Sequence, residues 1–133
     1  MEKGIKLIGS KFTRLEASRN PDFSGKVSMT NEIKILSIDF VKESKENVKM
    51  NYSYKIEYSG LGHVYLEGSL FMTSDPKTLK NIVKTFEDKD FESTEQIAVT
   101  NLIVQKASIK AMQLEDEFGL PVHVRIPAIS IKK

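Results

Sequence analysis

The alternation of residues 48–59, V-K-M-N-Y-S-Y-K-I-E-Y-S, constrains the fold more than any other stretch of the chain. Every even position there is apolar or aromatic, and every odd position is polar. A period of two is typical of a β-strand with one buried face and one face toward water. Sheets with one wet face are usually antiparallel, because the crossovers of parallel sheets cover both faces. We therefore expect an antiparallel sheet built around this strand.

Three further stretches are strand-like, namely residues 5–17, 27–41 and 64–72. The first two each break their alternation once, which indicates a β-bulge near Gly9 and another near Ile35. If residues 27–41 carry no bulge, that strand is apolar on both faces and could present one of them to a partner.

The connections between these strands predict which of them are neighbours. The loop at residues 18–25 is too long for a tight hairpin, so the first two strands need not lie side by side. Gly60 and Gly62 form a short connection, and we expect them to supply the positive-φ positions of a hairpin that joins the last two strands.

After the last strand the apolar period becomes helical. Asp75 followed by Pro76 predicts the start of a short helix, and Ser93 with Gln96 predicts a capping box that opens a long helix closed by Gly119. The long helix carries apolar residues on more than one stripe, whereas packing on a sheet requires only one. Another subunit or the C-terminal segment would cover the excess.

Residues 120–131 contain two prolines yet are rich in apolar side chains, so we expect them to lie extended in a groove of this chain or of a neighbour. A chain of 133 residues is long enough for one domain, spanning 1–133. The predicted fold class is α+β: a four-stranded antiparallel sheet with a crossover after the first strand, a short and a long helix on one face, and an extended C-terminal segment.

Composition and motifs exclude several functional classes. The chain has no cysteine, which rules out disulfides, thiol nucleophiles and thiolate zinc sites. A net charge of +2 is too small to indicate a nucleic-acid surface. His63 and His123 lack metal-ligand spacing, and Gly60 and Gly62 lack the third glycine of a dinucleotide loop. We expect no enzyme, no cofactor and no metal.

We also expect no targeting segment in this sequence. Its first residues lack the apolar core of a signal peptide, and no apolar run approaches membrane-spanning length. We expect a cytoplasmic protein that does not insert into membranes.

Two stretches carry a resemblance to a known family. Residues 8–17, I-G-S-K-F-T-R-L-E-A, are followed by Asn20 and Pro21, and residues 101–129 run from the long helix into F-G-L-P-V-H-V-R-I-P-A-I. With the order of predicted elements, they make the chain similar to the SecB family of protein-export chaperones over nearly its whole length.

The resemblance implies an ATP-independent holdase: a homotetramer, assembled as a dimer of dimers, that binds unfolded clients in apolar grooves for export or for an antitoxin. Apolar grooves accept many sequences because burial is non-directional. Our candidates for lining the client groove are Phe12, Leu15, Phe23, Val27 and Phe40, and those for the oligomer interface are Val99, Leu102, Ile103, Ile109 and Met112.

The sequence departs from the family at one docking position. An acidic pair on the first strand of the family docks the export motor SecA; Glu16 matches its second member, whereas Phe12 stands in place of the first. This departure argues against SecA as a partner. The alternative function is a non-enzymatic α+β binding domain that encloses one small apolar ligand, or holds one dedicated partner, between sheet and helix.

Overall fold

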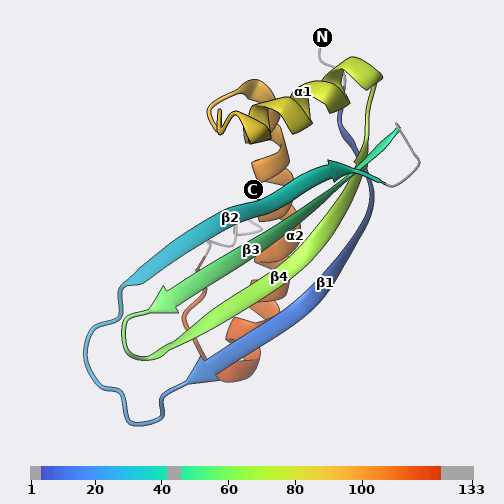
Figure 1. Cartoon of the computed structure of the whole chain (residues 1–133). Coiled ribbons are helices and arrows are strands. Elements are labelled where there is room, and N and C mark those ends of the chain that lie inside the picture. Colours follow the sequence, from blue (N-terminus) through green and yellow to red (C-terminus); the bar gives the residue numbers. More distant parts are fainter. Residues whose placement is uncertain (1–3, 42–45, 124–133) are drawn as a thin grey trace, which may run out of the picture.

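The computed structural model describes residues 4–41 and 46–123, which form one sheet and two helices (Figure 1). The elements, in chain order, are β1 (Lys6–Arg19), β2 (Met29–Phe40), β3 (Asn47–Tyr58), β4 (Gly62–Thr73), α1 (Pro76–Glu87) and α2 (Thr94–Phe118). The sheet is antiparallel with the order β1-β4-β3-β2, so β1 and β2 form its two edges. The predicted α+β class, the pairing of β3 with β4 and the separation of β1 from β2 are all confirmed.

Both edge strands are interrupted by bulges. The pairing of β1 with β4 shifts between Leu7 and Gly9 and again between Phe12 and Arg14, and the pairing of β2 with β3 shifts between Ile35 and Ser37. The first and last of these shifts confirm the two predicted bulges, with Ile8 and Leu36 as the extra residues, whereas the shift at Thr13 was not predicted. The side chains of Ile8 and Leu36 are 50% and 51% exposed, so each of these two bulges turns an apolar residue toward water.

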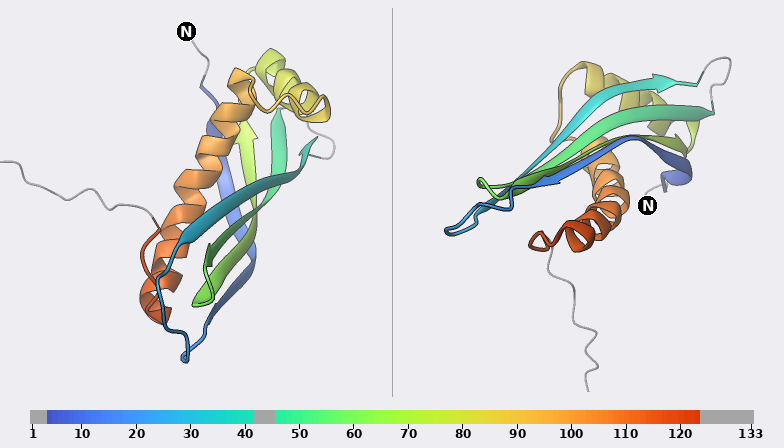
Figure 2. Two further views of the ribbon diagram at one scale, coloured as in Figure 1. Left: turned by 90° about the vertical axis from the view of Figure 1, so that its left-hand side faces the viewer. Right: turned by 90° about the horizontal axis from the view of Figure 1, so that it is seen from below.

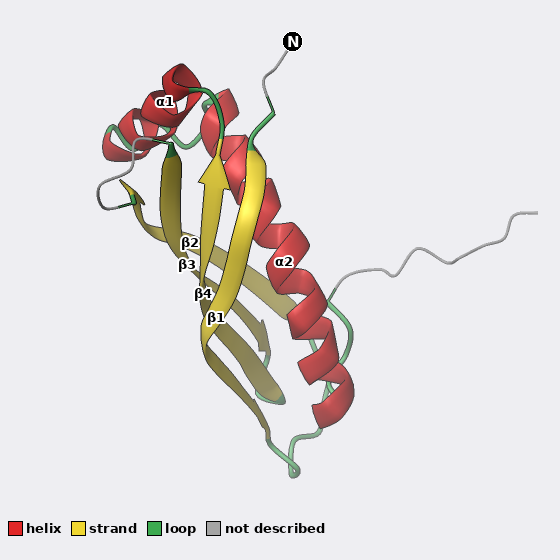
Figure 3. Ribbon diagram, turned by 90° about the vertical axis from the view of Figure 1, so that its right-hand side faces the viewer, coloured by secondary structure: helices red, strands yellow, loops and turns green. Residues whose placement is uncertain are grey.

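The core lies between the sheet and α2, which crosses one face of the sheet (Figures 2 and 3). The even-numbered side chains of β3 are all buried, as the alternation predicted. They meet a buried stripe on α2 that comprises Gln96, Val99, Ile103, Ala107, Ser108, Ala111 and Glu115. One helix face and one sheet face thus make a single hydrophobic core.

The two glycines between β3 and β4 have a different role from the one predicted. The positive φ in this turn belongs to Ser59, at 55°, and to neither glycine. A Cβ on Gly62 would lie 2.2 Å from the carbonyl oxygen of Ser18, and one on Gly60 would lie 3.3 Å from the ring of Phe23. Close approach of the end of β1 to Gly62 and of the loop residue Phe23 to Gly60, not an unusual φ, therefore explains both glycines.

The predicted helix boundaries are confirmed. The side chain of Asp75 accepts a hydrogen bond from the Thr78 backbone N–H, that of Ser93 accepts one from the Gln96 N–H, and Gly119 ends α2 with φ of 67°. The Gln96 side chain donates to the Ile82 carbonyl of α1 at 2.9 Å instead of reaching back to Ser93. It therefore ties the two helices together.

Arg19, at the end of β1, stabilises the other end of α2. Its guanidinium donates hydrogen bonds to the carbonyl oxygens of Phe118 and Gly119. The last turn of α2 has no basic residue of its own, so this contact supplies positive charge at the negative end of the helix dipole. Beyond Gly119, Leu120 is 5% exposed, and the extended course predicted for residues 124–131 lies outside the described residues.

Candidate binding surface

A hollow of about 450 Å³ opens beside the edge strand β2. It is lined by Ile33, Lys34, Ile35, Leu36, Phe91 and Thr100. Phe91 comes from the turn before α2 and Thr100 from the first part of that helix, so the hollow lies between the sheet edge and the helices. Four of its six lining side chains are apolar, which makes it suited to apolar groups of a ligand.

The bulge in β2 shapes this hollow. Ile33 and Ile35 face α2, since they pair with the buried Tyr54 and Tyr52 of β3. The shift at Leu36 adds a third apolar side chain that is half exposed, and Phe91 is likewise 50% exposed. Large apolar side chains gathered at an open sheet edge are characteristic of a surface that binds another polypeptide.

None of the five predicted client-binding residues lines this hollow. Phe12 and Leu15 lie on β1 and Phe40 lies on β2, at opposite edges of the sheet. Leu15, Val27 and Phe40 are 45%, 37% and 37% exposed. The structure therefore does not bring these residues into one groove, and their role in binding stays a prediction.

Two of the predicted client residues make contacts within the chain. Phe12 is partly buried, with the ammonium of Lys110 lying 5.9 Å from its ring centroid. Phe23 packs against the core from the crossover loop, whose Asn20 N–H donates to the Leu61 carbonyl at 2.7 Å. Phe23 therefore holds the loop against the turn between β3 and β4.

Glu16 lies on the face of the sheet opposite α2, because it pairs with Tyr65 while its neighbour Leu15 pairs with the buried Leu66. Its carboxylate is 3.4 Å from the Arg14 guanidinium, and both side chains are about half exposed. A second hollow, of about 270 Å³, lies here between Arg14, Glu16, Lys55, Glu57, His63 and Tyr65. Its lining mixes both signs of charge, so Glu16 does not stand in an acidic patch.

The predicted interface residues of α2 divide into two groups. Val99 and Ile103 are fully buried against the sheet of their own chain, so they have no surface left for a neighbour. Leu102 is half-buried and packs against the core of its own chain, Met112 is half-buried, and Ile109 is 57% exposed. The interface prediction therefore rests on Leu102, Ile109 and Met112.

The outward face of α2 has a regular pattern. Ala98, Leu102, Gln105, Ile109, Met112 and Asp116 alternate at intervals of four and three residues, which is the spacing of a heptad seam. A seam with four apolar members out of six can pack against a second helix, and it lies opposite the buried stripe.

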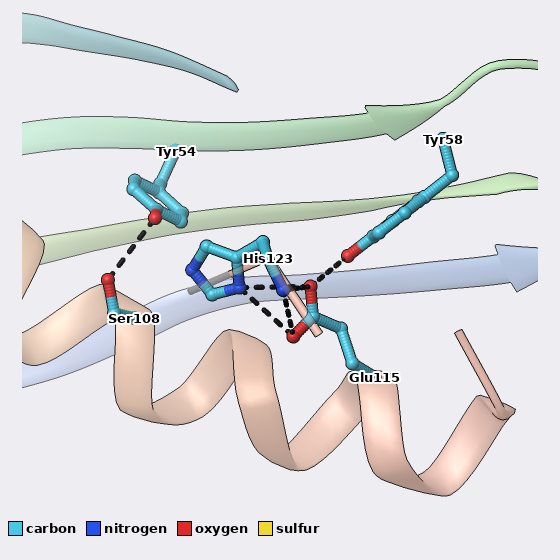
Figure 4. Close-up of polar contacts among 5 residues, drawn as sticks. All are labelled: Tyr54, Tyr58, Ser108, Glu115 and His123. Atoms are coloured by element: carbon cyan, nitrogen blue, oxygen red, sulfur yellow. Dashed lines mark hydrogen bonds and ion pairs between the residues drawn. The ribbon is translucent and has the colours of Figure 1, made fainter. Parts of the chain in front are cut away.

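A buried polar network joins the sheet, α2 and the segment that follows it (Figure 4). The Glu115 carboxylate is fully buried and accepts hydrogen bonds from the Tyr58 hydroxyl and the His123 backbone N–H. The Nδ1 atom of His123 lies 2.9 Å from the same carboxylate. About two turns earlier on α2, the hydroxyl of Ser108 lies 3.2 Å from that of Tyr54.

This environment raises the pKa of the tyrosines. Burial raises the pKa of Tyr58, and its hydrogen bond to the Glu115 carboxylate raises it further. Burial also raises the pKa of Tyr54, with a smaller contribution from the charge of Glu115, although the Ser108 hydrogen bond acts in the opposite direction. Removing water disfavours a phenolate, and so does a carboxylate beside it.

Sequence reasoning did not foresee this network. Glu115 and His123 are eight residues apart, and Tyr58 precedes Glu115 by 57 residues. The one available indication was Glu115 itself, which falls on the apolar stripe of a helix where a carboxylate needs partners.

The described residues contain no cluster of three or more histidine and acidic side chains able to hold a metal ion. Among the same residues, no helix combines the length and apolarity needed to cross a membrane.

Comparison with known proteins finds a match for the structure of this chain but none for its sequence. No family model matches the sequence, and no curated protein matches it. Among solved structures, the Mycobacterium tuberculosis Rv1957 SecB-like chaperone, in complex with a ChAD peptide from the HigA1 antitoxin, superposes with a TM-score of 0.62. The superposition covers 95% of this chain and 90% of that one, at 10% sequence identity.

This chain has the SecB-like fold. The sheet order β1-β4-β3-β2 with two helices after it is the architecture that the resemblance implied. At 10% identity the likeness establishes the SecB-like fold alone. Function must therefore be argued from the surfaces described above.

Proposed function

We propose that the protein is an ATP-independent holdase chaperone that binds non-native polypeptides at the apolar hollow beside β2. The observation that supports this most is the hollow itself, with Ile33, Ile35, Leu36 and Phe91 gathered at an open sheet edge. The protein of the same fold named above was captured with a peptide bound. Clients would be held extended by burial of scattered apolar side chains, without catalysis.

Cytoplasmic location and assembly into a homotetramer are part of this proposal. The heptad spacing on the outward face of α2 supports pairing of that helix between copies. The client could be an export substrate or an antitoxin, and SecA is not proposed as a partner because the face around Glu16 carries mixed charge.

An aggregation assay tests the proposal. The purified protein, without nucleotide, is added to several unrelated unfolded substrates, and light scattering is followed as they are diluted from denaturant. We expect suppression of aggregation at stoichiometric ratios. Failure with every substrate would refute the holdase function.

The chain offers a matched pair of variants for this assay. Leu36 and Ile8 are both the extra residue of a bulge on an edge strand, with nearly equal exposure, but only Leu36 lines the hollow. Leu36→Ser should weaken the protection, whereas Ile8→Ser should leave it unchanged. Equal effects of the two substitutions would place client binding elsewhere.

The alternative, a binding domain for one small apolar ligand, has one supporting observation: the volume of the hollow, about 450 Å³, suits a small molecule. The predicted enclosure between the sheet and the long helix is filled by core side chains such as Tyr52 and Ile103. A thermal-shift screen with small apolar compounds would favour this function if one compound raised the Tm strongly and substrates still aggregated.

A further inference from the structure

The face of the sheet opposite α2 carries an aromatic ring between two lysines. Phe71 lies between the buried Leu70 and Met72 on β4, so its side chain points away from the core, and α2 covers the other face (Figure 2). The ammonium of Lys11 on β1 lies 5.9 Å from the centroid of the Phe71 ring, and that of Lys49 on β3 lies 5.8 Å from it. We call Lys11, Lys49 and Phe71 the Phe71 cluster.

The strand register leaves this ring partly open to solvent. Phe71 pairs with Lys49 on β3 and with Gly9 on β1. A Cβ on Gly9 would lie 3.8 Å from the ring, so a larger residue there would contact it, whereas glycine has no side chain to cover it. Phe71 is accordingly only partly buried, in contrast to its neighbours Leu70 and Met72. A partly exposed aromatic ring beside cations suits contact with an apolar group of another molecule.

The two lysines of the cluster have no acidic partner within the described part of the chain. Neither Lys11 nor Lys49 forms an ion pair there, although Asp39 stands opposite Lys49 in the register of β2 and β3. By contrast, Lys34 and Lys55 on the same face each have a carboxylate partner, at 3.7 Å and 3.1 Å. The ammonium groups of the cluster are therefore available to carboxylates of another molecule.

The distribution of charge along this face favours a short acidic partner. Lys6 adds a third positive charge at this end of the sheet, since it pairs with the residue two positions after Phe71 on β4. Tyr65, six residues before Phe71 and about 20 Å away, lines the second hollow, where Glu16 and Glu57 lie among side chains of both signs. A long phosphate backbone laid along the face would meet these carboxylates, whereas a short acidic peptide segment at the Phe71 cluster would not.

We propose that the Phe71 cluster docks a short acidic segment of a partner polypeptide. Carboxylates of the segment bind the ammonium groups of Lys11 and Lys49, and an apolar side chain between them packs on the ring. The two ammonium groups are at most about 12 Å apart, since both lie within 6 Å of one centroid. Carboxylates about two to four residues apart in an extended segment reach both, because such a chain rises about 3.3 Å per residue.

This docking site is separate from the hollow beside β2 and does not depend on the holdase function. The hollow is lined by Ile33 and Ile35, which face α2, whereas Phe71 faces the opposite way. A partner on the outer face therefore leaves the hollow open.

Fluorescence anisotropy with a labelled peptide tests the proposal on the full chain. The probe is a fluorescein-labelled peptide in which pairs of glutamates flank one central leucine, and the control peptide has lysines in place of the glutamates. We expect saturable binding of the first peptide only, weakened when salt is raised from 0.1 M to 1 M, because the Debye length falls from about 10 Å to about 3 Å. No saturable binding, or equal binding of the two peptides, would overturn the proposal.

Two matched double variants distinguish the cluster from the net charge of the protein. Lys11→Glu with Lys49→Glu turns two attractions into repulsions and should raise the Kd of the glutamate peptide by at least about 10-fold. Lys34→Glu with Lys55→Glu changes the net charge equally on the same face and should raise it far less. Equal effects of the two double variants would show that the peptide responds to net charge alone, and the proposal would be wrong.

Single substitutions test the apolar contact. Phe71→Ser should raise the Kd of the glutamate peptide, whereas Leu36→Ser, in the hollow beside β2, should leave it unchanged. The reverse result would place the leucine of the peptide in the hollow and overturn the docking at Phe71. Circular dichroism and the unfolding midpoint of every variant are compared with those of the unaltered protein.

An NMR titration of the unaltered protein requires no substitution, so it remains decisive if a variant does not fold. The glutamate peptide should shift the backbone amide signals of Gly9, Ser69 and Phe71 more than those of Glu57 and His63, at the other end of the face. Larger shifts at the far end would contradict the proposed site. A labelled oligodeoxythymidine that bound as tightly as the peptide would show that the surface recognises nucleic acid instead of an acidic polypeptide.

Discussion

The hydroxyl of Tyr58 donates a hydrogen bond to the Glu115 carboxylate at a place where neither side chain is exposed to solvent. β3 and α2 are thereby joined by a charge-assisted contact inside an otherwise apolar core. The His123 backbone N–H donates a second hydrogen bond to the same Glu115 carboxylate.

Replacing Tyr58 by phenylalanine should destabilise the fold by about 1–3 kcal/mol, because the buried carboxylate loses a donor and water cannot replace it. Urea unfolding followed by circular dichroism gives the change. Tyr65→Phe is the control, since that hydroxyl donates to the half-exposed Glu67 at 2.5 Å, and its loss should have a smaller effect. A loss no larger for Tyr58→Phe than for the control would contradict the buried network.

Alkaline pH should unfold the protein through its buried tyrosines. Burial raises the pKa of Tyr52 to about 12, and it raises those of Tyr54 and Tyr58 too. A raised folded pKa means that the folded chain keeps protons which the unfolded chain releases above pH 10, so stability falls as pH rises. Each such tyrosine contributes a slope of at most ~1.4 kcal/mol per pH unit.

The measurement is the free energy of unfolding in urea between about pH 8 and pH 12, the window in which the tyrosines titrate. Tyr52→Phe should flatten the decline above pH 10. If the free energy of unfolding stayed constant up to about pH 12, the pKa of Tyr52, these phenols would be accessible to water.

Gly68→Ala should be strongly destabilising. A Cβ there would lie 2.6 Å from the Tyr52 hydroxyl and 2.8 Å from the Lys11 carbonyl oxygen. The backbone oxygen cannot move without opening the pairing of β1 with β4, so we expect a loss of roughly 1–3 kcal/mol, as for other overpacked sites. Gly9→Ala, whose Cβ would be 3.8 Å from Phe71, is the matched control. Thermal unfolding should show a large drop in Tm for the first variant only.

Charge on the outward face of α2 should dissociate the proposed oligomer. Four copies of the 15.1 kDa chain give about 60 kDa, to be measured by light scattering. Ile109→Glu places a carboxylate on the heptad seam and should lower the mass, whereas Ile97→Glu, at a residue of the same helix that is 50% exposed but off the seam, should not. A monomer in the unaltered protein would refute the assembly.

Local patterns were enough to predict the elements. The alternation of residues 48–59 reports which side of β3 is buried, and the capping residues Asp75, Ser93 and Gly119 act within a few residues of themselves. The two breaks in alternation located the bulges at Ile8 and Leu36 for the same reason, but not the shift at Thr13.

Contacts between distant residues were not predictable in this way. Periodicity does not predict that Phe91 and Ile33 line the same hollow, nor that Gly62 is required because the Ser18 carbonyl oxygen lies close to it. The candidate groove residues were chosen by exposure and apolarity along the chain, and the sheet order then placed Phe12 and Phe40 at opposite edges. Val99 was assigned to an interface because apolar content alone does not distinguish the two faces of α2.

The bulges at Ile8 and Leu36 have a consequence for how the protein behaves at high concentration. A long regular strand at a sheet margin is a template on which further chains can stack without limit. Here the pairing of each edge strand is interrupted by a bulge, and near Leu36 the side chains of Glu32 and Lys34 add opposite charges 3.7 Å apart. We therefore expect the edges of this sheet to resist stacking with further copies into fibrils.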